Sequence, residues 1–105
     1  MSAVMIYVTT GSREEAVAIG RAVVGERLAA CANVTPFISS IYWWDGRLQE
    51  EQEAALMLKT RRDLADQVIA RVKEMHSYDC PCVVSFSIDK GNEDFLEWII
   101  RETSQ

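Results

Sequence analysis

Residues 41–48, IYWWDGRL, place two adjacent tryptophans directly before an Asp-Gly pair. Asp45-Gly46 is a strong signal for a two-residue type I′ turn, which needs positive φ at both positions. The segment is therefore expected to form the tip of a β-hairpin. Because successive side chains on a strand point to opposite faces of the sheet, Trp43 and Trp44 must point in opposite directions. One tryptophan can enter the core of the domain, and the other needs a different cover.

Counting outward from the turn predicts the register of this hairpin, with Trp44 opposite Arg47 and Trp43 opposite Leu48. The face that carries Trp43 is expected to be the core face, and it also holds Ile41, Leu48, Ala54, Leu56 and Leu58. The opposite face holds Trp44 together with Ile38, Tyr42, Glu51, Glu53, Met57 and Lys59.

The hairpin is also expected to be longer than the domain that carries it. Thirteen residues of strand, 32–44, extend about 43 Å at roughly 3.3 Å per residue. A compact chain of 105 residues has a diameter of about 34 Å. A projecting hairpin with apolar side chains on both faces would promote aggregation unless another chain covers it. We therefore expect Trp44 to lie against a neighbouring subunit; the alternative is a partly exposed tryptophan that leans along its own strand.

The rest of the chain alternates strands and helices. Strands are predicted at 3–10, 32–44, 47–60 and 82–88, with Cys82, Val84, Phe86 and Ile88 sharing a face that we expect to point into the core. Ser12 with Glu15 fits a capping box for a helix that would end near Ala30, Thr60 with Asp63 can cap a second helix, and Asn92 can cap a last one.

This order, β-α-β-β-α-β followed by a helix, predicts an α+β fold, a ferredoxin-like sandwich built on one four-stranded sheet. The right-handed crossovers of the two β-α-β units place the first two helices on one face of that sheet. The other face has no helix assigned to it unless the C-terminal helix covers it. A length of 105 residues indicates a single domain, 1–105.

Composition excludes several classes of partner. A net charge of −5 argues against nucleic acid, and no run of about 20 apolar residues could span a membrane. The N-terminus does not resemble a signal peptide. Three cysteines, an odd number, with no secretory signal predict reduced thiols in a soluble, cytoplasmic protein.

A metal site is the first candidate chemistry. His76, Cys80 and Cys82 lie within seven residues of each other, and imidazole and thiolate are good ligands for copper(I) or zinc. We take His76 and Cys80 as the candidate metal ligands, with copper or zinc as the possible ion and no organic cofactor. The alternative for Cys82, and also for Cys31, is a buried thiol that acts as a small hydrophobic residue.

A ligand site on the outer face of the hairpin is the second candidate. Trp44, Glu53 and Lys59, with Tyr78 nearby, could bind a small anion or metabolite at a cleft between subunits. The alternative is a pair of interface charges, because six residues of strand separate Glu53 from Lys59 by about 20 Å. The chain has one histidine and no phosphate-binding glycine loop, so we do not expect an enzyme.

Three segments resemble the CutA family, the divalent-cation tolerance proteins, and the match in order and spacing runs along almost the whole chain. They are SIYWWDGRLQEEQEAALMLKT, ERLAACANV and HSYDCPCVVSF. The resemblance implies a ferredoxin-like homotrimer joined through long hairpins, cytoplasmic, linked to copper tolerance and metal binding, and without established catalysis. CutA trimers look like nitrogen-regulatory PII proteins, so the alternative is a signalling trimer that binds a metabolite or anion at the inter-subunit cleft.

This chain departs from the CutA pattern in the segment that begins at His76. The family usually reads His-Pro-Tyr-Glu-x-Pro-Glu, where this chain has Ser77 in place of the first proline and Cys82 in place of the final carboxylate. Metal or ligand contacts that depend on this segment are therefore expected to differ here.

Overall fold

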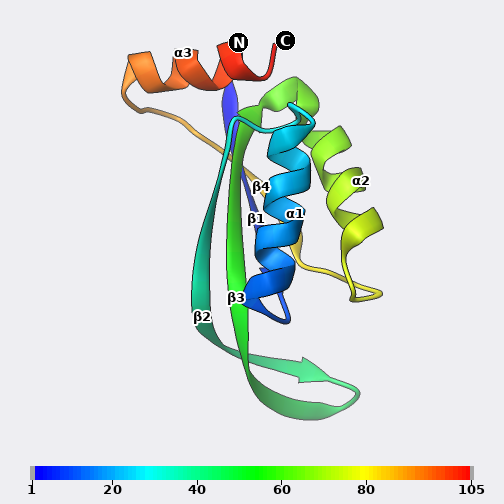
Figure 1. The fold of residues 1–105 in the computed structure, drawn as a ribbon. Helices are drawn as coiled ribbons and strands as arrows, with labels where there is room; N and C mark the ends of the chain where they lie inside the picture. The colour runs from blue at the N-terminus through cyan, green and yellow to red at the C-terminus, as the bar shows by residue number, and fades with distance from the viewer. Residues whose placement is uncertain (1, 105) are drawn as a thin grey trace.

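A computed structural model describes residues 2–104, and in this range the chain forms one four-stranded sheet and three α-helices (Figure 1). The strands are β1 (Ala3–Thr10), β2 (Cys31–Trp44), β3 (Arg47–Arg61) and β4 (Val83–Ser87). The helices are α1 (Arg13–Gly25), α2 (Ala65–Met75) and α3 (Glu93–Glu102), and a 3-10 turn, η1 (Arg62–Leu64), precedes α2. The predicted α+β class is confirmed.

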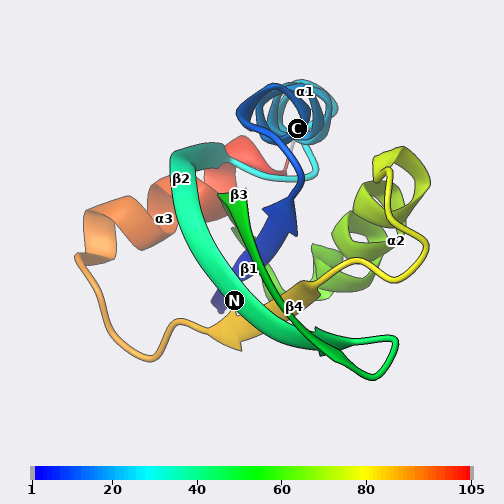
Figure 2. The same cartoon turned by 90° about the horizontal axis from the view of Figure 1, so that it is seen from below.

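The sheet has the strand order β2-β3-β1-β4, and each neighbouring pair is antiparallel. Helices α1 and α2 lie on one side of it and α3 on the other (Figure 2). The core lies between the sheet and the first two helices. It includes Val4, Ile6 and Val8 of β1, Leu56 and Leu58 of β3, Ala16, Ile19 and Val23 of α1, and Val68 and Val72 of α2. We call the opposite side of the sheet the open face.

The register of the hairpin is the predicted one. Trp44 pairs with Arg47 and Trp43 with Leu48. The turn residues Asp45 and Gly46 have φ of 53° and 73°, as a type I′ turn requires. One irregularity interrupts the β2–β3 ladder between Thr35 and Ile38, and a β-bulge of this kind bends the strand that carries it.

The hairpin projects from the molecule, which measures 44 × 25 × 22 Å. Because β1 ends at Thr10, opposite Ala54, the tip of the hairpin has no third strand beside it and curls away below the rest of the sheet (Figure 1). The prediction that Trp43 enters the core of the domain is wrong. Trp43 is 73% exposed and Trp44 is 61% exposed, so both tryptophans lie outside the core of their own chain.

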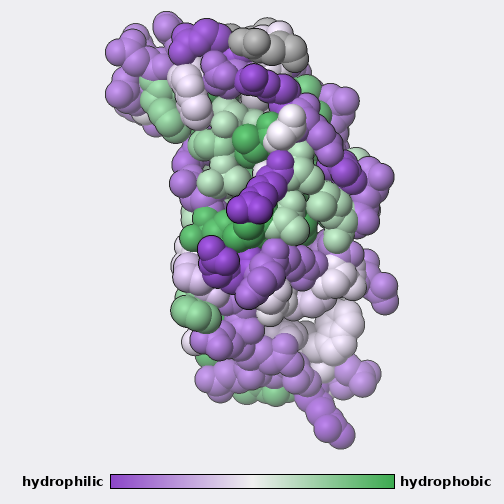
Figure 3. Space-filling model, in the orientation of Figure 1, coloured by the Kyte–Doolittle hydropathy of each residue, from purple (hydrophilic) through white to green (hydrophobic). Residues whose placement is uncertain are grey.

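Hydrophobic side chains also reach the surface elsewhere. On the side seen in Figure 3 they gather over the middle of the molecule, and smaller hydrophobic patches interrupt the hydrophilic surface of the hairpin end. On the open face, Val84 and Phe86 of β4 are exposed and pair with Tyr7 and Met5 of β1. The prediction that Cys82 faces the core with Val84 and Phe86 is wrong, because this face of β4 is the one that α1 and α2 do not cover, and Cys82 is exposed.

The predicted end of the first helix also differs from the structure. Helix α1 ends at Gly25 rather than near Ala30, because Arg27 adopts a left-handed conformation with φ of 65°. Ala30 directly precedes β2, and its N–H donates to the carbonyl of Lys59 in β3 at 2.8 Å.

The helix caps are predicted in two cases out of three. Ser12 accepts from the N–H of Glu15, and Asn92 accepts from the N–H of Asp94. No side chain caps η1 or α2, however. The hydroxyl of Thr60 instead donates to the carbonyl of Leu28 at 2.6 Å, which ties the end of β3 to the α1–β2 connection.

Candidate functional site

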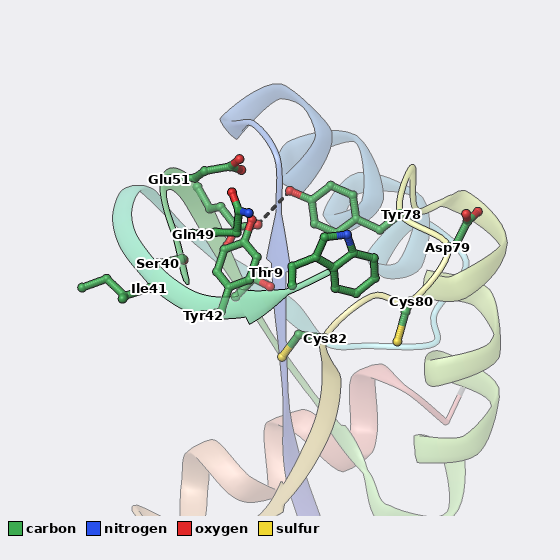
Figure 4. A pocket seen from close by; sticks show the side chains of 12 residues that line it. Thr9, Ser40, Ile41, Tyr42, Gln49, Glu51, Tyr78, Asp79, Cys80 and Cys82 are labelled. Carbon is green, nitrogen blue, oxygen red and sulfur yellow. Dashed lines mark hydrogen bonds between the residues drawn. The ribbon is translucent and has the colours of Figure 1, made fainter. Parts of the chain in front are cut away.

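A pocket of about 690 Å³ lies between the hairpin and the segment that links α2 to β4 (Figure 4). One wall comes from β2 and β3, a second from residues 78–82, and the end of β1 closes it. The lining residues are Thr9, Ser40, Ile41, Tyr42, Trp44, Gln49, Glu51, Glu53, Tyr78, Asp79, Cys80 and Cys82.

The lining is acidic. It contains the carboxylates of Glu51, Glu53 and Asp79, while no lysine, arginine or histidine within residues 2–104 lines this pocket. The lining also contains three aromatic side chains and two thiols. Carboxylates without neighbouring cations create a negative potential in a cleft, so the pocket attracts positively charged species.

Glu53 and Tyr78 form the most buried polar contact of the pocket. The hydroxyl of Tyr78 donates to Oε2 of Glu53 at 2.8 Å, drawn as the dashed line in Figure 4. Glu53 is only 8% exposed, and no cation within residues 2–104 forms an ion pair with it. Burial and the bond to Glu53 raise the pKa of Tyr78, so its hydroxyl stays protonated and keeps donating.

His76, which lies behind the pocket wall, fixes the position of Tyr78 through hydrogen bonds. Its side chain is fully buried, and Nδ1 accepts from the backbone N–H of Tyr78 at 3.1 Å. The ring proton therefore sits on Nε2, which donates to the carbonyl of Thr9 at 2.7 Å. Both ring nitrogens are occupied by hydrogen bonds, so His76 positions Tyr78 instead of presenting a free nitrogen to the pocket.

Glu15, in the first turn of α1, anchors the same segment. Its Oε2 accepts from the N–H of Ser77 at 2.8 Å, and its Oε1 accepts from the Ser77 hydroxyl at 3.1 Å. Burial acts to raise the pKa of Glu15, but the bonds that it accepts from Ser77 and from the backbone N–H of Gly11 outweigh it and hold that pKa below its ordinary value of 4.5. Ser77 thus supplies two donors, a backbone N–H and a hydroxyl, that a proline at this position would lack.

The structure brings together three of the four predicted ligand-binding residues. Trp44, Glu53 and Tyr78 all line the pocket. Lys59 does not: its Nζ donates to Oδ1 of Asn33 at 2.7 Å and lies 5.8 Å from the centre of the Phe95 ring. The anion-binding hypothesis therefore loses the cation on which it depended.

The two predicted metal ligands lie in different surroundings. Cys80 is exposed and lines the pocket, whereas His76 is buried behind it with both nitrogens engaged. Within residues 2–104 no group of three or more His, Cys, Asp or Glu side chains is placed to hold a metal ion. Cys82 lines the pocket with Cys80. Cys31 is partly buried elsewhere, and that burial raises the pKa of its thiol.

Sequence reasoning did not assign Tyr42, Glu51 or Asp79 to the site. A signal for the first two existed, because Tyr42 and Glu51 share the predicted outer face of the hairpin with Trp44 and Glu53. Asp79 carried no such signal, since its position depends on how the segment after α2 folds.

Comparison with known proteins points to one family. Residues 4–102 match the family model described as CutA1 divalent ion tolerance protein. A divalent-cation tolerance protein CutA of Pyrococcus horikoshii is 38% identical over 97% of this chain and 99% of its own length. A chloroplastic CutA 1 protein of Oryza sativa is also 38% identical, but this chain spans only 58% of it.

Solved structures agree with this result. The structure described as the periplasmic divalent cation tolerance protein CutA from Archaeoglobus fulgidus has a TM-score of 0.94 and 37% identity, covering 97% of this chain and 99% of that one. None of the helices within residues 2–104 is both long and apolar enough to cross a membrane.

Proposed function

The chain belongs to the CutA1 divalent ion tolerance family, and from this premise we propose that it binds a metal cation at the acidic pocket rather than catalysing a reaction. The relatives are named for tolerance to divalent cations and not for a reaction. The observation that carries the proposal is the pocket lining, in which three carboxylates and two thiols occur without a basic side chain.

Copper(I) or zinc is the ion that this donor set favours, because thiolates are soft ligands. Cys80 and Cys82 are the leading ligands, with Asp79 between the helix and these thiols as a further donor. His76 could join them only by giving up one of its two hydrogen bonds. Since no complete ligand set is preformed among residues 2–104, the remaining ligands would come from side chains that move or from a neighbouring copy.

The same proposal includes a homotrimer with ferredoxin-like topology. The strand order β2-β3-β1-β4, with α1 and α2 on one face, supports the topology. Trp43 and Trp44 on the hairpin and Val84 and Phe86 on the open face are exposed and apolar, and such surfaces are normally covered by a partner. A cytoplasmic location fits three free thiols, of which two are exposed.

The second candidate function is that of a PII-like signalling trimer that binds a metabolite at the cleft between subunits. The size of the pocket favours it, because about 690 Å³ is more than a metal ion needs. A small anion is a poor candidate for that ligand, since any cation to balance it would have to come from another subunit.

The metal proposal is tested by titrating untagged, reduced protein with copper(I) or zinc in a calorimeter. Cys80→Ser and Cys82→Ser should each weaken binding about tenfold or more, because thiolates contribute most to soft-metal affinity. Cys31→Ser is the matched control and should bind like the wild type, since Cys31 does not line the pocket. Unchanged affinity in both pocket variants would remove the metal site from this pocket. His76→Ala measures whether the imidazole contributes.

A further inference from the structure

We propose that the aromatic part of this pocket binds an alkylated organic ammonium ion, such as a trimethylammonium group on a small metabolite. The inference goes beyond the proposed metal binding, which uses the thiols at residues 80–82. It rests on Tyr42, Trp44 and Tyr78 around the buried carboxylate of Glu53.

The size of the pocket leaves room for an organic molecule beside any metal ion held at residues 80–82. A volume of about 690 Å³ falls within the range of small-molecule sites. A dehydrated metal ion needs several oxygen, nitrogen or sulfur atoms that converge on one point. No such cluster exists within residues 2–104. A quaternary ammonium group has no coordination geometry to satisfy and needs only surrounding negative potential.

The charge of Glu53 sets the sign of the ligand. This carboxylate is more than nine-tenths buried, yet within residues 2–104 the hydrogen bond that its side chain accepts comes from the neutral hydroxyl of Tyr78. A buried charge is stable only when it is paired or well hydrogen-bonded. Glu51 and Asp79 add to the negative potential of the same cavity. A cationic ligand would supply the opposite charge that no ion pair within residues 2–104 provides for Glu53.

The aromatic side chains identify the kind of cation. Tyr42 and Trp44 are two residues apart on β2, so they share one face of the hairpin, and Tyr78 comes from the facing wall. Among the described residues neither Tyr42 nor Trp44 stacks on another ring, and the only ring near that of Tyr78 is His76. Their remaining ring surface is therefore open to the cavity. Ring faces attract alkylated ammonium groups through cation–π interactions, and desolvated sites of this kind recognise quaternary amines.

The proposal is tested by calorimetric titration of the intact oligomer with choline and with its uncharged isostere, 3,3-dimethyl-1-butanol, at fixed ionic strength and with a metal chelator present. Choline should bind at least about tenfold more tightly than the isostere, because only choline carries the charge. The chelator separates this outcome from the metal proposal, since choline binding that persists without metal does not depend on it. Equal affinity for the two probes, or no binding of choline, overturns the proposal.

Two matched pairs of variants locate the site. Glu53→Gln should weaken choline binding about tenfold, while Glu50→Gln, the same change three residues away outside the pocket, should not. Trp44→Leu should weaken it by a similar factor, while Trp43→Leu should not. If light scattering shows that Trp44→Leu changes the oligomer, Tyr42→Leu replaces it. Wild-type affinity in Glu53→Gln, or in the aromatic pocket variant, contradicts the proposal.

Discussion

A continuous set of hydrogen bonds connects the start of α1 to the pocket, residue by residue. Glu15 holds Ser77, the backbone N–H of Tyr78 donates to His76, His76 donates to the end of β1, and Tyr78 reaches Glu53. Each donor in this set has an acceptor, as buried polar groups require. The only histidine of the chain is therefore explained by positioning of the segment after α2.

Removal of the Tyr78 hydroxyl should lower stability. Tyr78→Phe leaves the buried carboxylate of Glu53 without its donor, which should cost about 1 to 3 kcal/mol in the free energy of unfolding. Denaturant titration measures this cost. Tyr7→Phe is the control, because no hydrogen bond of the Tyr7 hydroxyl occurs within residues 2–104. Equal stability of the two variants would mean that the bond to Glu53 contributes nothing measurable.

The contribution of Glu15 should depend on pH. Its pKa is lower in the folded protein than its ordinary value of 4.5, so the folded state binds this proton less readily than the unfolded state does. The stabilisation is therefore present in full above about pH 5 and is lost as the pH falls through the folded-state pKa. Glu15→Gln should destabilise the protein by about 1 kcal/mol at pH 7 and by progressively less below pH 4.5. Thermal unfolding across this range measures it, with Glu14→Gln as the exposed neighbouring control; a constant difference at every pH would contradict the assignment.

At the scale of the elements, the hairpin shows what the sequence can and cannot predict. The Asp45-Gly46 turn determines the register, because positive φ at both positions leaves few alternatives. The faces follow from strict alternation. Alternation does not show which face the rest of the chain covers, because that depends on where α1, α2 and β1 end. The predictions that Trp43 and Cys82 lie in the core failed for this reason. The alternation of side chains behind those predictions was correct.

The helix ends show the same limit. The caps at Ser12 and Asn92 involve residues within four positions of each other, so the local sequence predicts them. Thr60 has the right residue type for a cap but is bonded to the distant Leu28. The pocket likewise combines four separate parts of the chain, so only its hairpin wall was visible from spacing.

Substitution of two glycines by alanine tests whether the turn depends on the left-handed conformation of Gly46. Gly46→Ala should lower the free energy of unfolding by about 1 kcal/mol, because Gly46 has φ of 73° and a side chain is strained there. Gly25→Ala is the control, since a Cβ at Gly25 meets nothing within 4 Å and alanine favours helix over glycine. Chemical denaturation distinguishes the two, and an equal loss in both would show that the left-handed conformation of Gly46 is not what matters.

A charge on the outer face of the hairpin should disrupt assembly. Trp44→Glu would place a carboxylate where we expect the surface of a neighbouring copy, which costs several kcal/mol if the charge is left unpaired there. Light scattering should show dissociation or precipitation of the variant. Retention of the wild-type mass by Trp44→Glu would place the contact between copies elsewhere.

Across the whole molecule, two kinds of surface lie near one another. Apolar side chains on the hairpin and the open face remain exposed in one chain, and an acidic pocket lies next to the hairpin. If neighbouring copies cover the hairpins, they also approach the pocket and can complete a ligand set that one chain leaves incomplete. Assembly and cation binding are then expected to depend on one another.

Native mass spectrometry of untagged, reduced protein, equilibrated with copper(I) or zinc and then freed of excess metal, tests this account most directly, because one spectrum gives both mass and bound metal. The account predicts a species of three chains that retains metal, and a Cys80→Ser, Cys82→Ser double variant that assembles equally but retains less. A stable monomer at micromolar concentration, or a trimer that retains no metal above the level of the double variant, would contradict it.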